Sequence, residues 1–222
     1  LDYIRKANVA GREAGGITQS IGAYEIIHPS TSSTSSLQAS SGQATSKRMT
    51  FIDTPGHEAF SKMRGRGAKV ADIAILVVAV DDGVQPQTKE AISIIQNVKL
   101  PFVVAINKID KENIDDARVK NELTAAGVLL EGYGGDVSFQ RVSAKTGEGV
   151  DELLDLVALS AEVAELDYDP SVSGTGIILE SKLDSRRGII ATGIIKNGTL
   201  TAGDALATPS ASGKIKGLED FS

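Results

Sequence analysis

The sequence predicts an α/β fold, in which a doubly wound, mostly parallel sheet is followed by an incomplete antiparallel β-barrel. Up to residue 166, apolar runs typical of strands alternate with segments of helical spacing, and two of those runs are almost continuously aliphatic. Such runs are typical of parallel strands that are buried on both faces. After residue 166 the helical spacing stops. We therefore expect two domains, residues 1–166 and residues 167–222.

Within the first domain, strands and helices are expected to follow one another in turn. The expected strands cover residues 49–52, 73–80, 102–106 and 137–142, and the expected helices cover residues 57–69, 87–98, 115–126 and 150–165. Residues 21–27 should form a hairpin with the first of these strands. Such alternation implies right-handed crossovers, and the ligands of such sheets bind beyond the carboxyl ends of the strands.

The second domain has short β-type runs at residues 176–183, 188–196 and 205–208. The Asn197-Gly198 pair between two of these runs predicts a hairpin turn. About four strands fit into the remaining length, which is too few to close a barrel. A further predicted turn contains Arg186 and Arg187, which are interpreted as solvated.

Composition and charge narrow the classes of function. The chain of 222 residues is 41% hydrophobic and has no cysteine, which excludes disulfides and thiolate metal sites. No apolar run approaches the roughly 20 residues that span a bilayer. The net charge of -6 excludes the broad basic face of a non-specific nucleic-acid binder. We expect a cytoplasmic monomer that does not associate with membranes.

Two motifs in the first domain predict recognition of a base. Residues 107–110 read Asn-Lys-Ile-Asp and residues 143–145 read Ser-Ala-Lys, each after a predicted strand. The Asp110 carboxylate can accept hydrogen bonds from N1–H and the exocyclic amine of guanine, a donor pair that adenine lacks. Asn107 would tie the loop together, and the Lys108 stem would lie along the base. The second motif, which would offer a backbone N–H to the guanine oxygen, consists of Ser143, Ala144 and Lys145.

A third motif, further upstream, predicts contacts to phosphate and metal. It consists of Asp53, Thr54, Pro55, Gly56 and His57. Asp53 ends a predicted strand, where its carboxylate can hold Mg2+ through water. Gly56 has no Cβ, so its N–H can approach a γ-phosphate. His57 is placed to orient the attacking water, and the alternative is a helix residue without a catalytic role. His28 has no such context and is interpreted as a loop residue.

Together, the three motifs in this order indicate a site for GTP or GDP, although either base motif alone could be a capped turn. The sequence contains no G-x-x-x-x-G-K-[ST] phosphate loop, whose row of N–H groups normally cradles the β-phosphate. We therefore expect this chain by itself to bind GTP poorly and to be nearly inactive as an enzyme.

The chain resembles the translational GTPases at residues 14–19, 53–57 and 81–88. Residues 14–19 read Ala-Gly-Gly-Ile-Thr-Gln, and this form most resembles the family of bacterial-type translation initiation factor two. The resemblance implies a P-loop GTPase fold that lacks its first strand and phosphate loop, with Thr18 as a Mg2+ ligand. It also implies that the chain begins just after that loop and ends within the second domain of a longer protein.

The same resemblance implies a function. A full-length protein of this kind would hydrolyse GTP to GDP and phosphate, and would promote initiator-tRNA placement and subunit joining on the ribosome. Its partners would be rRNA and ribosomal proteins, with initiator tRNA bound through domains absent here. Two alternatives remain: another translational GTPase such as an elongation factor, or a nucleotide-independent interaction module if the start of the chain is authentic.

Two polar features have no assigned role. Residues 30–46 are rich in Ser and Thr and are expected to form a disordered hairpin tip, with a ribosome-contacting or modified loop as the alternative. A solvated helix face and a contact to rRNA phosphates are equally consistent with the basic residues Lys62, Arg64, Arg66 and Lys69.

Overall fold

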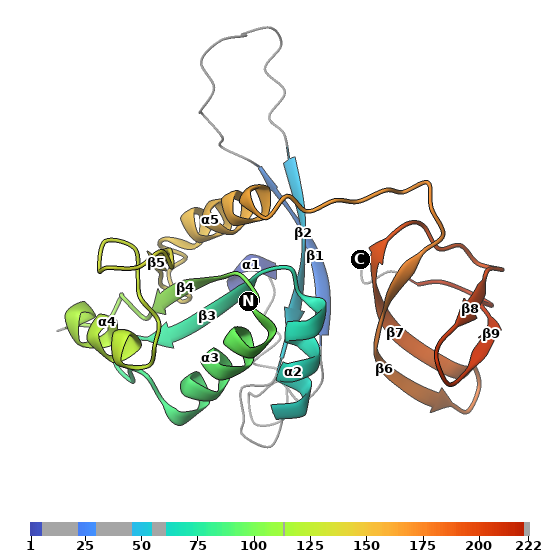
Figure 1. Ribbon diagram of the computed structural model, residues 1–222, viewed down its shortest axis with the longest axis horizontal. Helices are drawn as coiled ribbons and strands as arrows, with labels where there is room; N and C mark the ends of the chain where they lie inside the picture. Colours follow the sequence, from blue (N-terminus) through green and yellow to red (C-terminus); the bar gives the residue numbers. More distant parts are fainter. Residues whose placement is uncertain (6–21, 30–45, 55–60, 113, 220–222) are drawn as a thin grey trace, which may run out of the picture. The chain divides into compact units, whose positions relative to one another are not determined.

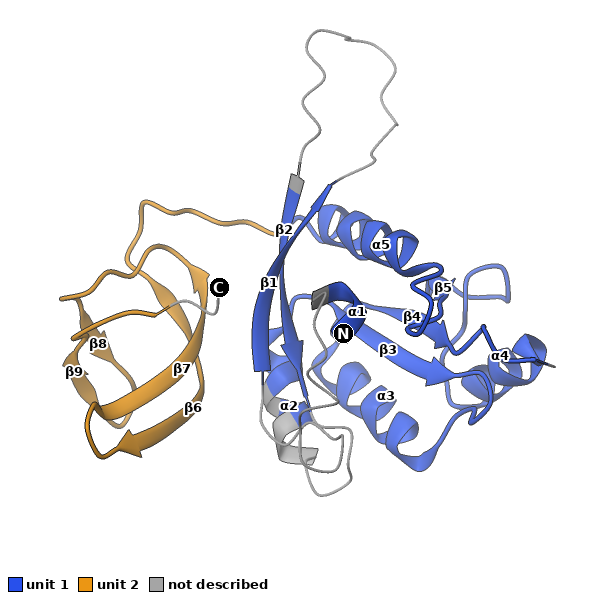
Figure 2. Ribbon diagram, turned by 180° about the vertical axis from the view of Figure 1, so that it is seen from behind, with its two compact units in different colours: residues 1–165 blue, residues 166–222 orange. Residues whose placement is uncertain are grey.

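The chain folds into two compact units, Leu1–Glu165 and Leu166–Ser222, which are coloured separately in Figure 2. The first unit carries a parallel sheet and its helices, and the second is built from antiparallel strands. The computed structural model describes residues 1–5, 22–29, 46–54, 61–112 and 114–219 (Figure 1).

A parallel three-stranded sheet forms the centre of the first unit. Its strands, in spatial order, are β3 (Ala74–Ala79), β4 (Phe102–Asn107) and β5 (Phe139–Arg141). The helices are α1 (Asp2–Arg5), α2 (Ser61–Val70), α3 (Pro86–Val98), α4 (Asp116–Ala125) and α5 (Val150–Val163). This alternation confirms the order expected from the sequence, although β5 is shorter than expected. None of the described helices has the length and apolar character needed to cross a membrane.

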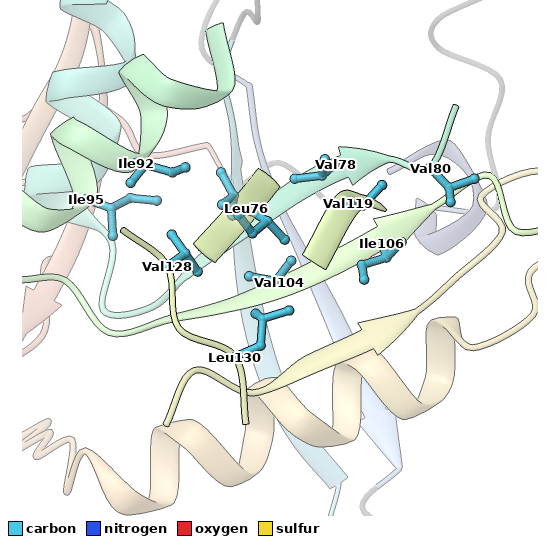
Figure 3. Close-up of a cluster of buried hydrophobic side chains, with 11 residues drawn as sticks. Leu76, Val78, Val80, Ile92, Ile95, Val104, Ile106, Val119, Val128 and Leu130 are labelled. Carbon is cyan, nitrogen blue, oxygen red and sulfur yellow. The ribbon is translucent and has the colours of Figure 1, made fainter. Parts of the chain in front are cut away.

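The side chains of β4 alternate between the two faces of the sheet. Val104 and Ile106 join a buried cluster with residues of β3, α3 and α4 (Figure 3). Val103 and Ala105 join a second buried cluster, which includes Leu153 of α5. Because all four β4 side chains are buried, the strand has no solvent face, and this explains its aliphatic sequence. Helices cover both faces, as a doubly wound fold requires.

A hairpin precedes this sheet in the chain, as the sequence predicts. Its strands, β1 (Gly22–Pro29) and β2 (Ser46–Asp53), pair antiparallel, and Tyr24 stacks on Phe51 with ring centroids 5.5 Å apart. Among the described residues, no ladder hydrogen bonds join this hairpin to the β3–β4–β5 sheet. Of the Ser-rich segment at residues 30–46, residues 30–45 lie outside the described residues. Ser46 is the first residue of β2 and pairs with Pro29, so the prediction of disorder is wrong at that position.

His28 is not a loop residue, so its interpretation from the sequence is wrong. It lies in β1 with 7% of its surface exposed, and its Nε2 is 2.9 Å from Oδ1 of Asp155 on α5. Lys47, opposite His28 in the hairpin, forms an ion pair with Glu162, about two helical turns further along α5. Two polar pairs therefore attach the hairpin to α5.

The second unit contains two antiparallel strand pairs among its described residues. β6 (Thr175–Asp184) pairs with β7 (Gly188–Asn197), and β8 (Ala205–Ala207) pairs with β9 (Ser212–Lys214). Within the described part of the chain these pairs do not join into a closed barrel. The incomplete barrel expected from the sequence is therefore supported only as antiparallel strand pairs.

The Asn197-Gly198 pair does not form the predicted hairpin turn, because β7 pairs with β6 and not with β8. Gly198 has φ 76°, and a Cβ there would lie 2.5 Å from the carbonyl oxygens of Val172 and Ser173. The glycine therefore lets the chain pass close to the segment before β6. There the Thr199 N–H donates to the Val172 carbonyl at 3.1 Å.

Arg186 and Arg187 lie in the exposed turn between β6 and β7, as interpreted from the sequence. Both backbone N–H groups donate to Oδ1 of Asp184 at 2.8 Å. These bonds hold the pKa of the Asp184 carboxyl below its ordinary value. Arg187 also forms an ion pair with Glu219, so its guanidinium has a protein partner as well as solvent.

Candidate functional site

The two base-recognition motifs meet at the carboxyl edge of the parallel sheet. Asn107 is the last residue of β4, and Ser143 follows the end of β5 by two residues. Parallel pairing of these strands brings their ends to the same edge. Asp53, from the third motif, ends β2 in the separate hairpin.

Direct hydrogen bonds join the two base-recognition motifs. The Ala144 N–H donates to Asn107 Oδ1 at 3.0 Å, and the Ser143 hydroxyl donates to Asp110 Oδ1 at 2.7 Å. Ser143 is fully buried, and its Oγ also accepts from the Thr146 N–H at 3.1 Å. Asn107 and Ser143 therefore hold the two loops in a fixed relation to each other.

The Asp110 carboxylate is kept ionised by its surroundings. The hydrogen bond from Ser143 is the main reason that the pKa of Asp110 is below its ordinary value, and Lys145, with Nζ 4.0 Å from Oδ2, adds to it. An ionised carboxylate only accepts hydrogen bonds, and its oxygens have several lone pairs, so the Ser143 bond leaves acceptor capacity unused. Among the described residues no acceptor is found for the Lys145 backbone N–H, whereas the Ser143 N–H donates to the Glu148 carbonyl at 2.8 Å.

Lys108 has a left-handed backbone conformation, with φ 70°. Its ammonium nitrogen is 2.9 Å from Asp81 Oδ1 and 2.8 Å from Asp82 Oδ2, while Lys111 pairs with Oδ2 of Asp81. These contacts hold the pKa of Asp81 far below its ordinary value, mainly through Lys111, and raise the pKa of Lys108, mainly through Asp82. Because a left-handed non-glycine residue costs about 1–2 kcal/mol, the ion pairs help to hold a conformation that is intrinsically unfavourable.

Helix α4 braces the loop that follows β3. Arg118 Nη2 donates to the carbonyl oxygens of Val80 and Asp81, both at 3.0 Å. Glu122 accepts from the Val84 N–H at 2.7 Å and from Arg118 Nη1 at 3.3 Å. Sequence reasoning missed both helix residues. The only signal in the sequence was the acidic pair Asp81 and Asp82, which follows the carboxyl end of β3 and indicates that basic partners lie nearby.

The phosphate and metal motif is described only in part. Thr54 packs near α2, where its Cγ2 would lie 2.8 Å from a Cβ at Gly67. Among the described residues no group of three or more His, Cys, Asp or Glu side chains could hold a metal. A single carboxylate at Asp53 nevertheless fits Mg2+, which usually takes one or two protein carboxylates together with waters and substrate phosphates. The predicted site residues outside the described part are Thr18, Pro55, Gly56 and His57.

The basic residues of α2 do not form one solvated face. The Arg64 side chain is only 10% exposed and forms an ion pair with Glu90 of α3. Both expectations for Arg64, solvation and contact with rRNA, are therefore wrong, because its guanidinium is held in an ion pair between α2 and α3. Lys69 is exposed. The side chains of Lys62 and Arg66 lie outside the described part.

Comparison with known proteins assigns this fold to a class. A family model described as the elongation factor Tu GTP binding domain matches residues 7–162, and the chain belongs to this family of translational GTPases. The chain is also 50% identical, over 220 residues, to the chloroplastic translation initiation factor IF-2 of Euglena gracilis. That match covers 99% of this chain and 26% of the relative, so the chain spans about a quarter of the relative's length. The resemblance to initiation factor two is confirmed.

Two solved structures share the fold across most of this chain. GDP-bound aIF5B from Aeropyrum pernix matches with a TM-score of 0.64 and 32% identity, over 92% of this chain and 40% of that chain. The elongation factor SelB from Methanococcus maripaludis, in complex with the GTP analogue GppNHp, matches with a TM-score of 0.67 and 25% identity, over 92% and 42% of the two chains.

Proposed function

We propose that this chain is the GTP-binding core of a translation initiation factor that hydrolyses GTP to GDP and phosphate in its full-length form. The observation that carries the proposal is the Asp110 carboxylate, ionised and held by the buried Ser143 hydroxyl. Such a carboxylate matches the N1–H and amine donors of guanine. Adenine would instead present an acceptor at N1, and two acceptors facing each other leave both unpaired.

The remaining contacts to guanine can be assigned by asking which hydrogen-bonding groups of the two motifs already have a partner within the protein. The Ala144 N–H is bonded to Asn107, so the guanine oxygen would accept from the Lys145 N–H. The Lys108 ammonium is held by two carboxylates, and this leaves its methylene stem to lie along the base. Each of these residues thereby has one role in holding or reading guanine.

We assign the phosphates to the loop that begins at Asp53 and Thr54. Asp53 and Thr18 would hold Mg2+, which supplies neutralisation of phosphate charge when bound. The Gly56 N–H would donate to the γ-phosphate, because a glycine has no Cβ to block the approach. His57 would orient the attacking water.

The cellular role and location are proposals of the same kind. The 50% identity to a translation initiation factor supports the ribosome, with its rRNA and proteins, as partner, and initiator tRNA bound through other domains. An elongation factor is the second candidate, supported by the similarity to SelB. The named relative is chloroplastic, so we widen the predicted cytoplasmic location to include an organelle that makes its own proteins.

Asp110→Asn in the full-length protein tests the base assignment. The amide replaces an acceptor by a donor, so the variant should prefer XTP to GTP, measured by competition against a fluorescent guanine nucleotide. The exposed Asp136→Asn provides the matched control and should keep the preference for GTP. An Asp110→Asn protein that still prefers GTP would show that Asp110 does not read the base.

The test of the base assignment needs a protein that includes the phosphate loop. Without a phosphate loop, the 222-residue chain is predicted to bind GTP at least a hundredfold more weakly than a version extended upstream to include that loop. Titration calorimetry of both versions measures this difference. Equal affinities would show that the loop contributes little.

A further inference from the structure

We propose that Arg118 and Glu122 of α4 are positioning residues for guanine recognition, which act through the loop at residues 80–84 and the side chain of Lys108. The proposal rests on the proposed function, because it explains how the base-reading loop is held in place. It concerns residues that would not themselves touch the nucleotide.

The first step is the attachment of α4 to the end of β3. The carbonyl groups of Val80 and Asp81 lie beyond the last residue of the strand, so they need donors from outside the ladder. Arg118 supplies one nitrogen that donates to both oxygens at 3.0 Å. The Val80 N–H meanwhile donates to the Asn107 carbonyl at 2.9 Å. The start of the loop is therefore fixed both to α4 and to the base-recognition motif.

The second step is the attachment of the far end of the loop. Gly83 has φ 70°, and a Cβ there would lie 2.2 Å from Oε2 of Glu122. Only glycine leaves room for this approach, which lets the same oxygen accept from the Val84 N–H at 2.7 Å. Arg118 and Glu122 also bond to each other at 3.3 Å, so the two attachments form one unit.

The third step leads from the loop to the base-reading side. Asp81 is held on its backbone by Arg118 and on its carboxylate by Lys108 and Lys111. Asp82 supplies a second carboxylate to Lys108 at 2.8 Å. A shift of the loop would therefore move the Lys108 side chain, whose backbone lies in the unfavourable left-handed region.

Charge balance in this network indicates orientation rather than attraction. Two carboxylates, of Asp81 and Asp82, face two ammonium groups, of Lys108 and Lys111. Such a neutral group contributes little to the attraction of anionic phosphates. Loss of the Arg118 and Glu122 contacts should therefore lower the affinities for GTP and for GDP by the same factor, because both nucleotides carry the same base.

Arg118→Gln in the full-length protein tests the proposal. Affinities for GTP and GDP should both fall about tenfold with their ratio unchanged, and the preference for GTP over ITP should fall at least threefold. ITP lacks the exocyclic amine that Asp110 would read, so this preference reports on the placement of the base. A merely structural brace would lower the thermal midpoint and leave the preference for GTP over ITP unchanged, which would overturn the proposal.

Arg141→Gln is the matched control. Arg141 Nε is 2.8 Å from Asp116 Oδ2, so it also contacts α4 through an ion pair, but no contact of Arg141 with residues 80–84 is found among the described residues. This variant should keep the wild-type affinities and preference. If the wild-type protein and Arg141→Gln both fail to prefer GTP to ATP, the proposed function fails and the question of positioning does not arise.

A second variant keeps the proposal testable if Arg118→Gln does not fold. The exposed Asp82→Asn removes one partner of Lys108 and should reduce the preference for GTP over ITP in the same direction by a smaller factor. Where Arg118→Gln does fold, the double variant should lose less than the product of the two single effects, because both act through Lys108. An unchanged preference in Asp82→Asn, or fully multiplicative effects in the double variant, would contradict the proposal.

Discussion

Polar side chains hold two regions of the first unit: the base edge, meaning the carboxyl edge of the parallel sheet where the two base-recognition motifs meet, and the β1–β2 hairpin. The polar contacts of the base edge connect loops, whereas those of the hairpin connect strands to a helix. At the base edge, hydrogen bonds join loops to each other, from Asn107 to Ala144 and from Ser143 to Asp110. In the hairpin, His28 and Lys47 join the two paired strands to the side of helix α5. The first arrangement fixes groups that could bind a ligand, and the second fixes the position of a whole element.

This difference separates the expected effects of mutations. The loops that carry Asp110 and Ser143 are joined to each other by hydrogen bonds, so changes there should alter nucleotide selection. The hairpin ends at Asp53, where the phosphate motif begins, so changes beyond that point should alter hydrolysis. Changes at the attachment to α5 should alter stability and leave the preference for guanine unchanged.

The largest effect is expected for His57→Ala, which separates hydrolysis from base binding. In the full-length protein, ribosome-stimulated hydrolysis should fall by about 10² or more, because a group that positions water is lost. GTP affinity should stay within a few-fold, since the base edge is untouched. Single-turnover hydrolysis on ribosomes, measured beside nucleotide affinity, gives both values. Hydrolysis at the wild-type rate would remove His57 from the catalytic role.

Thr18→Ala sharpens the same test. It would remove a metal ligand, so the GTP-bound conformation itself should weaken, with GTP affinity falling more than GDP affinity. His57→Ala should leave that ratio unchanged. Equal loss for both nucleotides in Thr18→Ala would contradict its assignment to the metal.

The next largest effect is expected for Ser143→Ala at the base edge. The change removes the hydroxyl that donates to Asp110 and accepts from the Thr146 N–H, so GTP and GDP affinity should both fall tenfold or more. Ser160→Ala is the matched control, because its hydroxyl donates to the Leu156 carbonyl within α5 and no other partner of it is found among the described residues, so it does not contact the base-recognition motifs there. Titration calorimetry on both variants makes the comparison. Equal affinities in the two variants would show that Ser143 does not hold the base reader.

His28→Ala tests the hairpin side and should act on stability alone. It removes a hydrogen bond to Asp155 from a nearly buried site, so the free energy of unfolding should fall by about 1–3 kcal/mol. Lys47→Gln, in the more exposed pair with Glu162, should cost less than about 1 kcal/mol. Urea unfolding measures both, and the preference for GTP over XTP should stay at the wild-type value. A changed preference would show that the hairpin attachment reaches the base edge.

The sequence predicted what depends on local pattern. Continuous aliphatic runs located β3 and β4 within one residue or two, and helical spacing located α3 to α5. The sequence predicted all three motifs at the carboxyl ends of the strands of one sheet. The two base-recognition motifs do meet there, because each follows a strand of the parallel sheet, whereas Asp53 ends a strand of the separate hairpin. Family membership also followed from short motifs.

Contacts between distant parts of the chain could not be predicted in this way. His28 looked like a loop residue because its partner, Asp155, is 127 positions away. The sequence does not single out Arg118, since its acceptors are backbone carbonyls that carry no sequence signal. The Asn197-Gly198 pair has the composition of a hairpin turn, but strand pairing elsewhere in the sheet decided its conformation.

The smallest effect is expected for Asp81→Asn, seen as a change in acid sensitivity. Lys111 and Lys108 hold the pKa of Asp81 well below its ordinary value in the folded state. The unfolded state therefore takes up this proton first as pH falls, so the contribution of Asp81 to stability is present above about pH 4 and is lost below it. The variant should be slightly less stable than wild type at pH 7, and this difference in the free energy of unfolding should shrink between about pH 4 and pH 2.

Urea unfolding of both proteins from pH 7 to pH 2 measures this difference. At pH 7, 1 M salt should reduce the difference, because the ion pairs of Asp81 are partly exposed. A difference that stays constant from pH 7 to pH 2 would show that the Asp81 ion pairs do not stabilise the fold.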